Sequence, residues 1–206
     1  MLTFDIPALT IPERSRLLAR VVAPRPIAFV STVGADGVGN LAPFSYFTMG
    51  GGNPACLTFC TVNLRDGKEK DSLRNIEATG EFVVNVVTRA MAEQMNRTAV
   101  DFSSDVDEFD VSGFTRTASV RVKPPGVAES PVRIECRLVQ VVRVGEGASA
   151  SNFIIGEVLY VSADDAVCTD GLPDNHKLDQ LSRLGADLYL PMTPDALFSM
   201  ARPAKP

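Results

Sequence analysis

Alternating apolar and charged positions are clearest in the second half of the chain. In 132–144, VRIECRLVQVVRV, apolar side chains alternate with charged ones, as expected for a strand with one buried face. The segment 152–164, NFIIGEVLYVSAD, follows a turn that contains glycine and serine, and it predicts the next strand. Apolar, β-branched and aromatic residues predict further strands at 24–32, 54–62 and 81–87. The pattern therefore indicates a chain rich in strands.

Turn signals join these strands closely. The sequence GADG at 34–37 predicts a hairpin turn, and 38–50 is its expected partner strand. Pro43 is expected to interrupt that strand, as at a sheet edge or a bulge. With 14 prolines and 15 glycines the chain has residues for many such turns. Strands joined by short turns, with few helices between them, favour a mainly β fold, an antiparallel barrel of about six strands.

Helical patterns are short and scattered. Residues 11–22 predict a helix with Pro12 in its first turn. A second helix is expected after these, with Asp71 or Ser72 as the cap of its start and Gly80 at its end. Two more predicted helices lie at 89–99 and 177–185, and the acidic segment 101–114 is expected to be an exposed, partly helical loop.

Size and charge limit the class of protein. The 206 residues, 45% of them hydrophobic, suit one domain, with a barrel core at about 20–164 and a C-terminal arm at about 165–206. The net charge of −5 argues against nucleic-acid binding, which usually needs a basic face. The N-terminal stretch is not typical of a signal peptide, and no apolar run approaches the ~18 residues of a membrane helix. We therefore expect a cytoplasmic protein with no membrane or nucleic-acid partner.

The cysteines and the single histidine give no catalytic or metal motif. Cys56, Cys60, Cys136 and Cys168 form no CxxC pair and are interpreted as buried, reduced thiols. With only His176 available, no metal site is expected. His176 is the one candidate for an acid–base residue, and a surface histidine is the simpler interpretation. GxSxG, GxGxxG and Walker sequences are absent.

Two stretches have the residues of a binding site. Lys70, Asp71 and Ser72 open a predicted helix, whose N-terminus favours an anion such as phosphate. Taken alone, this stretch is better explained as an ordinary helix cap with solvated charges, because capping is far commoner than phosphate binding. In 39–50, GNLAPFSYFTMG, polar groups and free backbone groups near Pro43 could contact the edge of a polar heterocycle, and a bulged barrel strand is the alternative.

The order of five motifs adds a resemblance. RPIAFVST, GxxNLAPFSYF, KEKDSLRNI, TGEFVVNVV and RLGADLY follow one another between about Pro24 and Tyr189. In this the chain resembles the flavin reductase-like family, whose fold is an FMN-binding split barrel, antiparallel and Greek-key, with peripheral helices. The resemblance implies FMN as cofactor, with Lys70, Asp71 and Ser72 at its phosphate. The tail lacks the second glycine that the family often has near Tyr189.

The resemblance also implies the remaining flavin contacts. The flavin ring and ribityl chain would be lined by Asn40, Ala42, Pro43, Ser45 and Tyr46. Further contacts would come from two strand ends, with Ser31, Thr32, Cys60, Thr61 and Asn63.

The implied activity is NAD(P)H-dependent reduction of flavin, with hydride passing from nicotinamide C4 to flavin N5. Because the flavin does this chemistry, no dedicated acid or base is required. The family implies a homodimer, and its reduced flavin could serve a monooxygenase or another electron acceptor. Two alternatives stay open: a non-enzymatic FMN-binding protein or electron carrier, and a split barrel that has lost flavin and acts as an interaction module.

Overall fold

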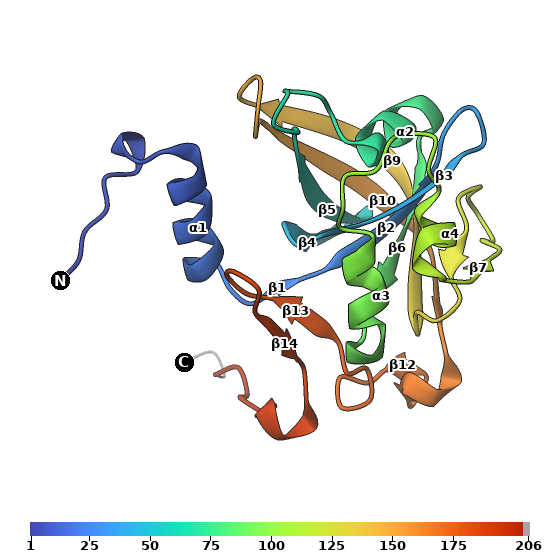
Figure 1. Cartoon of the computed structure of the whole chain (residues 1–206). Helices are drawn as coiled ribbons and strands as arrows, with labels where there is room; N and C mark the ends of the chain where they lie inside the picture. The colour runs from blue at the N-terminus through green and yellow to red at the C-terminus, as the bar shows by residue number, and fades with distance from the viewer. Residues whose placement is uncertain (204–206) are drawn as a thin grey trace.

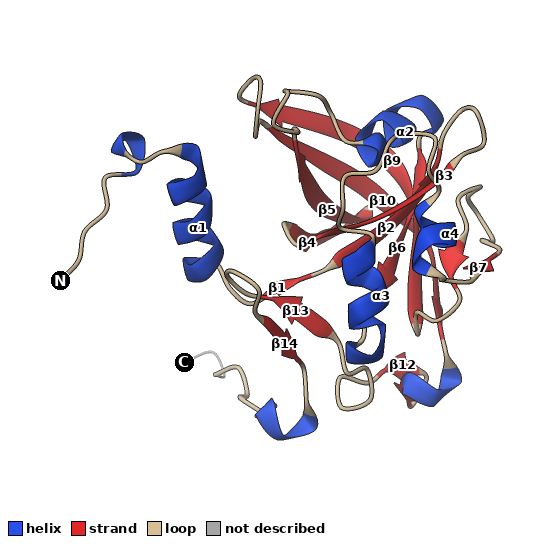
Figure 2. Ribbon diagram, viewed as in Figure 1, coloured by secondary structure: helices blue, strands red, loops and turns tan. Residues whose placement is uncertain are grey.

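Seven antiparallel strands form the main sheet of the protein. The computed structural model describes residues 1–203, and all its α-helices except the N-terminal one lie around this sheet (Figures 1 and 2). The strand order is β3-β2-β6-β9-β10-β5-β4, with every neighbouring pair antiparallel. The strands are β2 (Ala28–Val33), β3 (Gly39–Phe44), β4 (Phe47–Gly52), β5 (Ala55–Val62), β6 (Glu81–Val86), β9 (Val132–Val144) and β10 (Ser151–Ala163).

The two ends of this sheet meet at one short link. Strands β3 and β4 lie at opposite ends of the strand order, yet only Ser45 and Tyr46 separate them in the chain. The sheet must therefore curl until its ends meet, which makes a barrel with a seam at this link. The Cys60 amide donates to the Tyr46 carbonyl at 2.8 Å and ties the link to β5.

The predicted break in the strand 38–50 lies two residues later than expected. Pro43 is paired opposite Phe29 inside β3, and the strand ends after Phe44 instead. Because β3 is a terminal strand of the sheet, the missing N–H of Pro43 costs no ladder hydrogen bond there. The predicted turn at 34–37 is confirmed, with the Gly34 amide donating to the Val38 carbonyl at 2.8 Å.

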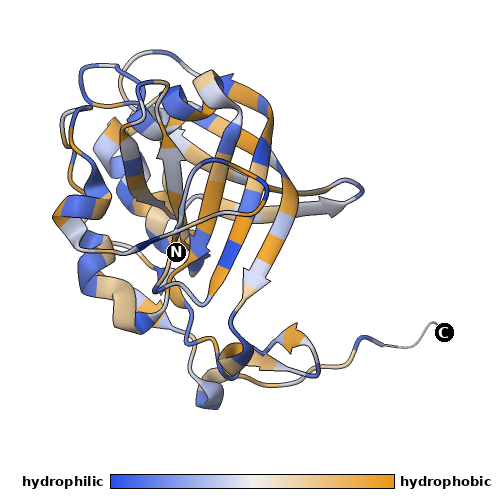
Figure 3. Ribbon diagram, turned by 90° about the vertical axis from the view of Figure 1, so that its right-hand side faces the viewer, coloured by the Kyte–Doolittle hydropathy of each residue, from blue (hydrophilic) through white to orange (hydrophobic). Residues whose placement is uncertain are grey.

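Two clusters of buried side chains form the core. Inside the barrel the rings of Phe44, Phe59 and Phe82 pack with centroids 5.2 and 5.6 Å apart. The second cluster includes Phe29 and Phe109 and lies between the sheet and the helices. Both faces of β2 are therefore buried, which explains its continuous apolar sequence. The longer strand β9 instead alternates apolar with charged residues over much of its length, and Figure 3 shows such alternation of hydrophobic and hydrophilic residues along strands of the barrel.

The helices are short, as the sequence predicted. They are α1 (Ile11–Val21), α2 (Asp71–Thr79), α3 (Ala92–Arg97) and α4 (Glu108–Ser112), with 3-10 turns at Ile6–Ala8, Arg89–Met91, Asp165–Val167 and Pro194–Ala196. Helix α2 ends at Gly80, whose φ of 76° is in the left-handed region. None of the helices among residues 1–203 is long and apolar enough to cross a membrane.

Seven short strands complete the fold, and one replaces a predicted helix. They are β1 (Arg25–Pro26), β7 (Arg116–Thr117), β8 (Gly126–Val127), β11 (Cys168–Thr169), β12 (Leu172–Pro173), β13 (Leu181–Arg183) and, at the end of that series, β14 (Tyr189–Pro191). The helix predicted at 177–185 is wrong, because β13 pairs with both β1 and β14. Leu178 and Leu181 have helical spacing, but both are buried and the distant β1 determines the backbone. The last residues of the predicted arm, 204–206, lie outside the described part.

Helix α1 stands apart from the barrel (Figure 1). None of its residues is buried in the single chain, and Thr10 and Glu13 form a capping box at its start. Arg25 holds its other end, because the guanidinium donates to the carbonyls of Ala19 and Val22 at 2.7 and 2.6 Å. The N-terminal arm is thus joined to the body mainly at one point.

Candidate functional site

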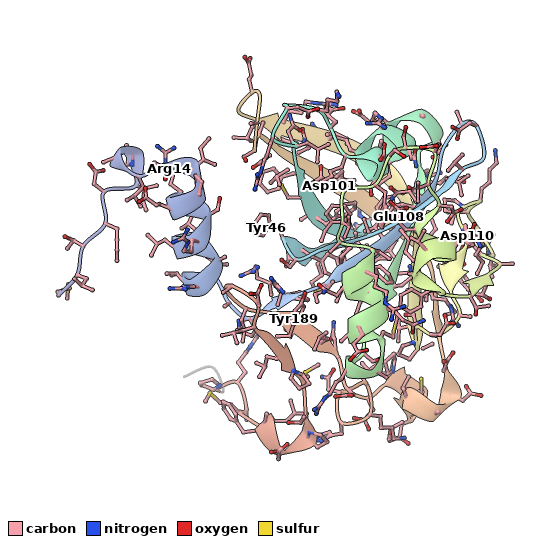
Figure 4. The ribbon with its side chains drawn as sticks, in the orientation of Figure 1. Arg14, Tyr46, Asp101, Glu108, Asp110 and Tyr189 are labelled. Carbon is pink, nitrogen blue, oxygen red and sulfur yellow. The ribbon has the colours of Figure 1, made fainter. Side chains whose placement is uncertain are left out.

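A cavity of about 520 Å³ opens at the seam of the barrel. It lies beside the Ser45–Tyr46 link, between the start of α2 and the segment that follows α3. Figure 4 labels three of its lining residues, Tyr46, Asp101 and Glu108, which come from three separate segments. A volume of this size lies within the ~300–1,000 Å³ range of small-molecule sites.

Most of the residues predicted for the site line this cavity. They are Asn40, Ala42, Pro43, Ser45, Tyr46, Cys60, Lys70, Asp71 and Ser72. They come from β3, the link, β5 and α2, so the fold brings together the two stretches that the sequence indicated separately.

The start of α2 forms one wall. Lys70 is the N-cap residue, with no capping hydrogen bond from its side chain, and Asp71 and Ser72 are the first two helical residues. The prediction that Asp71 or Ser72 caps the helix is therefore wrong. The hydroxyl of buried Ser72 instead accepts a hydrogen bond from Asn40 Nδ2 at 2.8 Å. The first N–H groups of a helix have no intrahelical acceptor, so this end suits an anion.

Each positively charged side chain at the cavity is paired with a carboxylate. Lys70 pairs with Asp101, Arg74 pairs with Asp71, and Lys68 lies 2.9 Å from Asp66. All three pairs are partly exposed, so each contributes at most about 1 kcal/mol. An incoming anion therefore meets cations that already have weakly held partners.

Glu108 is a cavity residue that the sequence did not indicate. The segment 101–114 was predicted to be exposed, but Glu108 is only 6% exposed and its Oε2 accepts from the Leu41 amide at 3.0 Å. Burial raises the pKa of the Glu108 carboxyl group, and the charges of Asp71 and Asp107 act in the same direction. The overlooked signal is the helix start at Asp107, whose side chain caps the Phe109 amide at 3.0 Å.

Four of the predicted contacts support the site from outside the cavity. Ser31 donates to the Pro125 carbonyl at 2.6 Å, and Thr32 accepts from Asn75 of α2 at 3.1 Å. Asn63 donates to the carbonyls of Gly67 and Gly147, which orders the loop before α2. Thr61 is fully buried, and its hydroxyl has no hydrogen-bond partner among the described residues. None of these four side chains lines the cavity.

His176 and Tyr189 do not line the seam cavity. His176 is exposed and lines a separate hollow with Leu197 and Phe198. Tyr189 packs against the second core cluster, with the Arg183 guanidinium 4.3 Å from its ring centroid. Within one chain, the loop of His176 therefore does not cover the seam cavity.

The thiols are all free. Cys60 and Cys136 are buried as predicted, whereas Cys56 and Cys168 are half-buried. Burial raises the pKa of both the Cys60 and the Cys136 thiol, so both stay protonated at neutral pH. Cys60 therefore contributes an uncharged side chain to the cavity wall.

Comparison with known proteins decides the family. The sequence model of the flavin reductase like domain matches residues 20–178. The chain belongs to the flavin reductase-like family. The predicted resemblance is thereby confirmed, and the family match covers both the α2 start and the seam of the barrel.

Solved structures agree with this assignment. Nitrilotriacetate monooxygenase component B from Bacillus cereus has a TM-score of 0.89, with 29% identity and 98% of each chain covered. The 2-nitrobenzoate 2-nitroreductase NbaA of Pseudomonas fluorescens has a TM-score of 0.85, with 25% identity over 100% of this chain and 96% of that one. A split-barrel protein from Shewanella frigidimarina has a TM-score of 0.80, with 26% identity and 100% of each chain covered. The predicted split-barrel fold is confirmed.

Proposed function

We propose that this protein is an NAD(P)H-dependent flavin reductase that binds FMN in the seam cavity. The observation that carries the proposal is the junction at the start of α2. There the free N–H groups of a helix, the Lys70 ammonium and the Ser72 hydroxyl border one cavity. This set of donors matches a phosphate group, and FMN carries one.

The rest of the lining suits the remaining parts of FMN. Asn40 and the buried carboxyl group of Glu108 offer hydrogen-bonding groups to a polyhydroxyl chain. Ala42, Pro43 and Tyr46 offer apolar surface and an aromatic ring to a flat heterocycle. The apolar Cys60 thiol completes that wall without adding charge.

Bound flavin supplies the exchange of hydride and single electrons, so the protein itself needs only to bind the flavin, orient it and shield it. No histidine lines the cavity, since the single His176 lies at another hollow. We infer that reduced flavin or its electrons pass to a monooxygenase or another acceptor, in a cytoplasmic setting. Nitrilotriacetate monooxygenase component B bears a name consistent with such a flavin-supplying role.

Anaerobic mixing tests the proposal against both alternatives. The FMN-loaded protein is mixed with NADH and, separately, with NADPH, while the absorbance of oxidised flavin is followed. We expect saturable bleaching with at least one of them, faster than for free FMN at the same concentration. Bound FMN that no nicotinamide reduces would favour an electron carrier. A protein that binds no flavin would favour an interaction module.

We further propose that the protein is a homodimer. Large apolar side chains are exposed on α1, at the residue that follows it and on the β9–β10 hairpin of the single chain, namely Ile11, Leu18, Val21, Val22, Val139, Val142, Val144, Phe153, Tyr160 and Val161. Exposure on this scale is typical of an interface. Light scattering should give about twice the 22.1 kDa chain mass. A monomer at the same protein concentration would contradict the homodimer.

A further inference from the structure

The segment between α3 and α4, residues 99–106, crosses one side of the seam cavity. We call it the strap, and its residues 99–104 line the cavity. Both ends of the strap are fixed. Thr98 is buried and donates to the Met95 carbonyl at 2.8 Å, and Asp107 accepts from the Gly39 amide at 3.1 Å. Between these two anchors the strap must be held by contacts of its own.

Those contacts are almost all local. The Ala99 amide donates to Asn96, the Val106 amide donates to Ser103, and Ser103 bonds to Asp105. Among the described residues, the one hydrogen bond or ion pair from the strap to the rest of the barrel joins Asp101 to Lys70. The strap is therefore latched through the side chain that borders the start of α2.

This latch places a carboxylate at the site proposed for phosphate. Lys70 is the N-cap of α2, so its ammonium and the first helical N–H groups face the same cavity. An ammonium has three N–H donors and could contact two anions, but a phosphate and the Asp101 carboxylate would then repel each other at short range. The side chain of Asp101 is 62% exposed, so it can move into solvent when displaced.

We propose that Asp101 competes with the flavin phosphate for Lys70 and thereby sets the selectivity for phosphorylated flavins. This inference rests on the proposed binding of FMN and adds the residue that keeps its affinity low enough for exchange. An exposed ion pair is worth about 0–1 kcal/mol, so the latch opens at small cost. Phosphate binding and release of the strap are then one linked equilibrium.

Asp101→Asn tests the competition, with Asp66→Asn as the matched control. Both carboxylates line the cavity and pair with a lysine, but Lys68, the partner of Asp66, lies in the loop before α2. Both substitutions remove one negative charge and keep the side-chain shape. Dissociation constants for FMN and riboflavin are measured by flavin fluorescence for the wild type and both variants.

We expect Asp101→Asn to tighten FMN binding about 3- to 5-fold, the effect of ~0.7–1 kcal/mol, and to slow FMN release. Riboflavin, which lacks the phosphate, should change by less than about twofold, because its binding does not require Lys70. Unchanged or weaker FMN binding in Asp101→Asn would overturn the inference. So would an equal gain for riboflavin, or an equal gain in Asp66→Asn. If the wild type binds riboflavin and FMN equally well, the phosphate site itself is wrong, and if it binds neither, the proposed function fails.

Discussion

Replacing Lys70 and Ser72 together by alanine is expected to weaken FMN binding by about 100-fold or more. Hydrogen bonds to a charged group contribute ~1.5–3 kcal/mol each, and the double substitution removes two such donors. The helix N–H groups stay in place, so binding should fall without being abolished. Riboflavin binding should change far less, because it carries no phosphate for these donors.

The measurement is a titration of both flavins into both proteins. Lys68→Ala is a suitable control, because Lys68 also lines the cavity but its side chain is 74% exposed and lies before the helix start. Its loss should weaken FMN binding by less than about tenfold, as for a solvated charge. Equal losses for FMN and riboflavin in the double variant would contradict the phosphate assignment.

Local patterns predicted the strands because their alternation reflects burial on one face. The segment 132–144 is a good example, since β9 has these bounds, and the apolar segment 152–164 was predicted to within one residue of β10. The helix predicted at 177–185 is wrong, because pairing of β13 with β1 and β14 decides that segment. Closure of the barrel at Ser45 and Tyr46 also depends on strand order, which a local pattern does not contain.

The residues of the candidate site also divide into those that local sequence predicts and those that depend on the tertiary structure. Lys70, Asp71 and Ser72 are consecutive, so their place at a helix start could be predicted from the sequence. Glu108 and Asp101 reach the cavity only because the segment 98–108 folds across the barrel seam. The acidic sequence around them indicated a solvated loop. Only the tertiary structure shows that the Glu108 carboxyl group is buried while the Asp101 carboxylate is exposed.

Arg25 is a further residue whose role depends on tertiary contacts. Its side chain is 7% exposed and donates to the carbonyls of Ala19, Val22 and Leu184 at 2.6–3.0 Å. The first two carbonyls belong to the end of α1, where a cation is favourable, and the third belongs to the C-terminal arm. The guanidinium also lies 5.7 Å from the ring centroid of Tyr46 at the cavity. One residue therefore connects both arms to the candidate site.

Arg25→Met should consequently destabilise the protein by about 2–4 kcal/mol, less than the sum of three charge-assisted hydrogen bonds at ~1.5–3 kcal/mol each. For a chain of this length that lowers Tm by about 5–15 °C, measured at one fixed protein concentration because association also shifts Tm. FMN binding should weaken several-fold as well, since Tyr46 loses its neighbour.

Arg14→Met is the matched control for this loss. Arg14 also donates to two carbonyls, those of Leu9 and Pro7, but both lie in its own N-terminal segment (Figure 4). The Arg14→Met substitution should lower the free energy of unfolding by less than about 1 kcal/mol, because partly exposed carbonyls regain hydrogen bonds from water. A similar fall in Tm for both variants would contradict a special role for Arg25. A large fall in the Tm of Arg25→Met with unchanged FMN affinity would support the structural role of Arg25 and show that its contact with Tyr46 does not affect FMN binding.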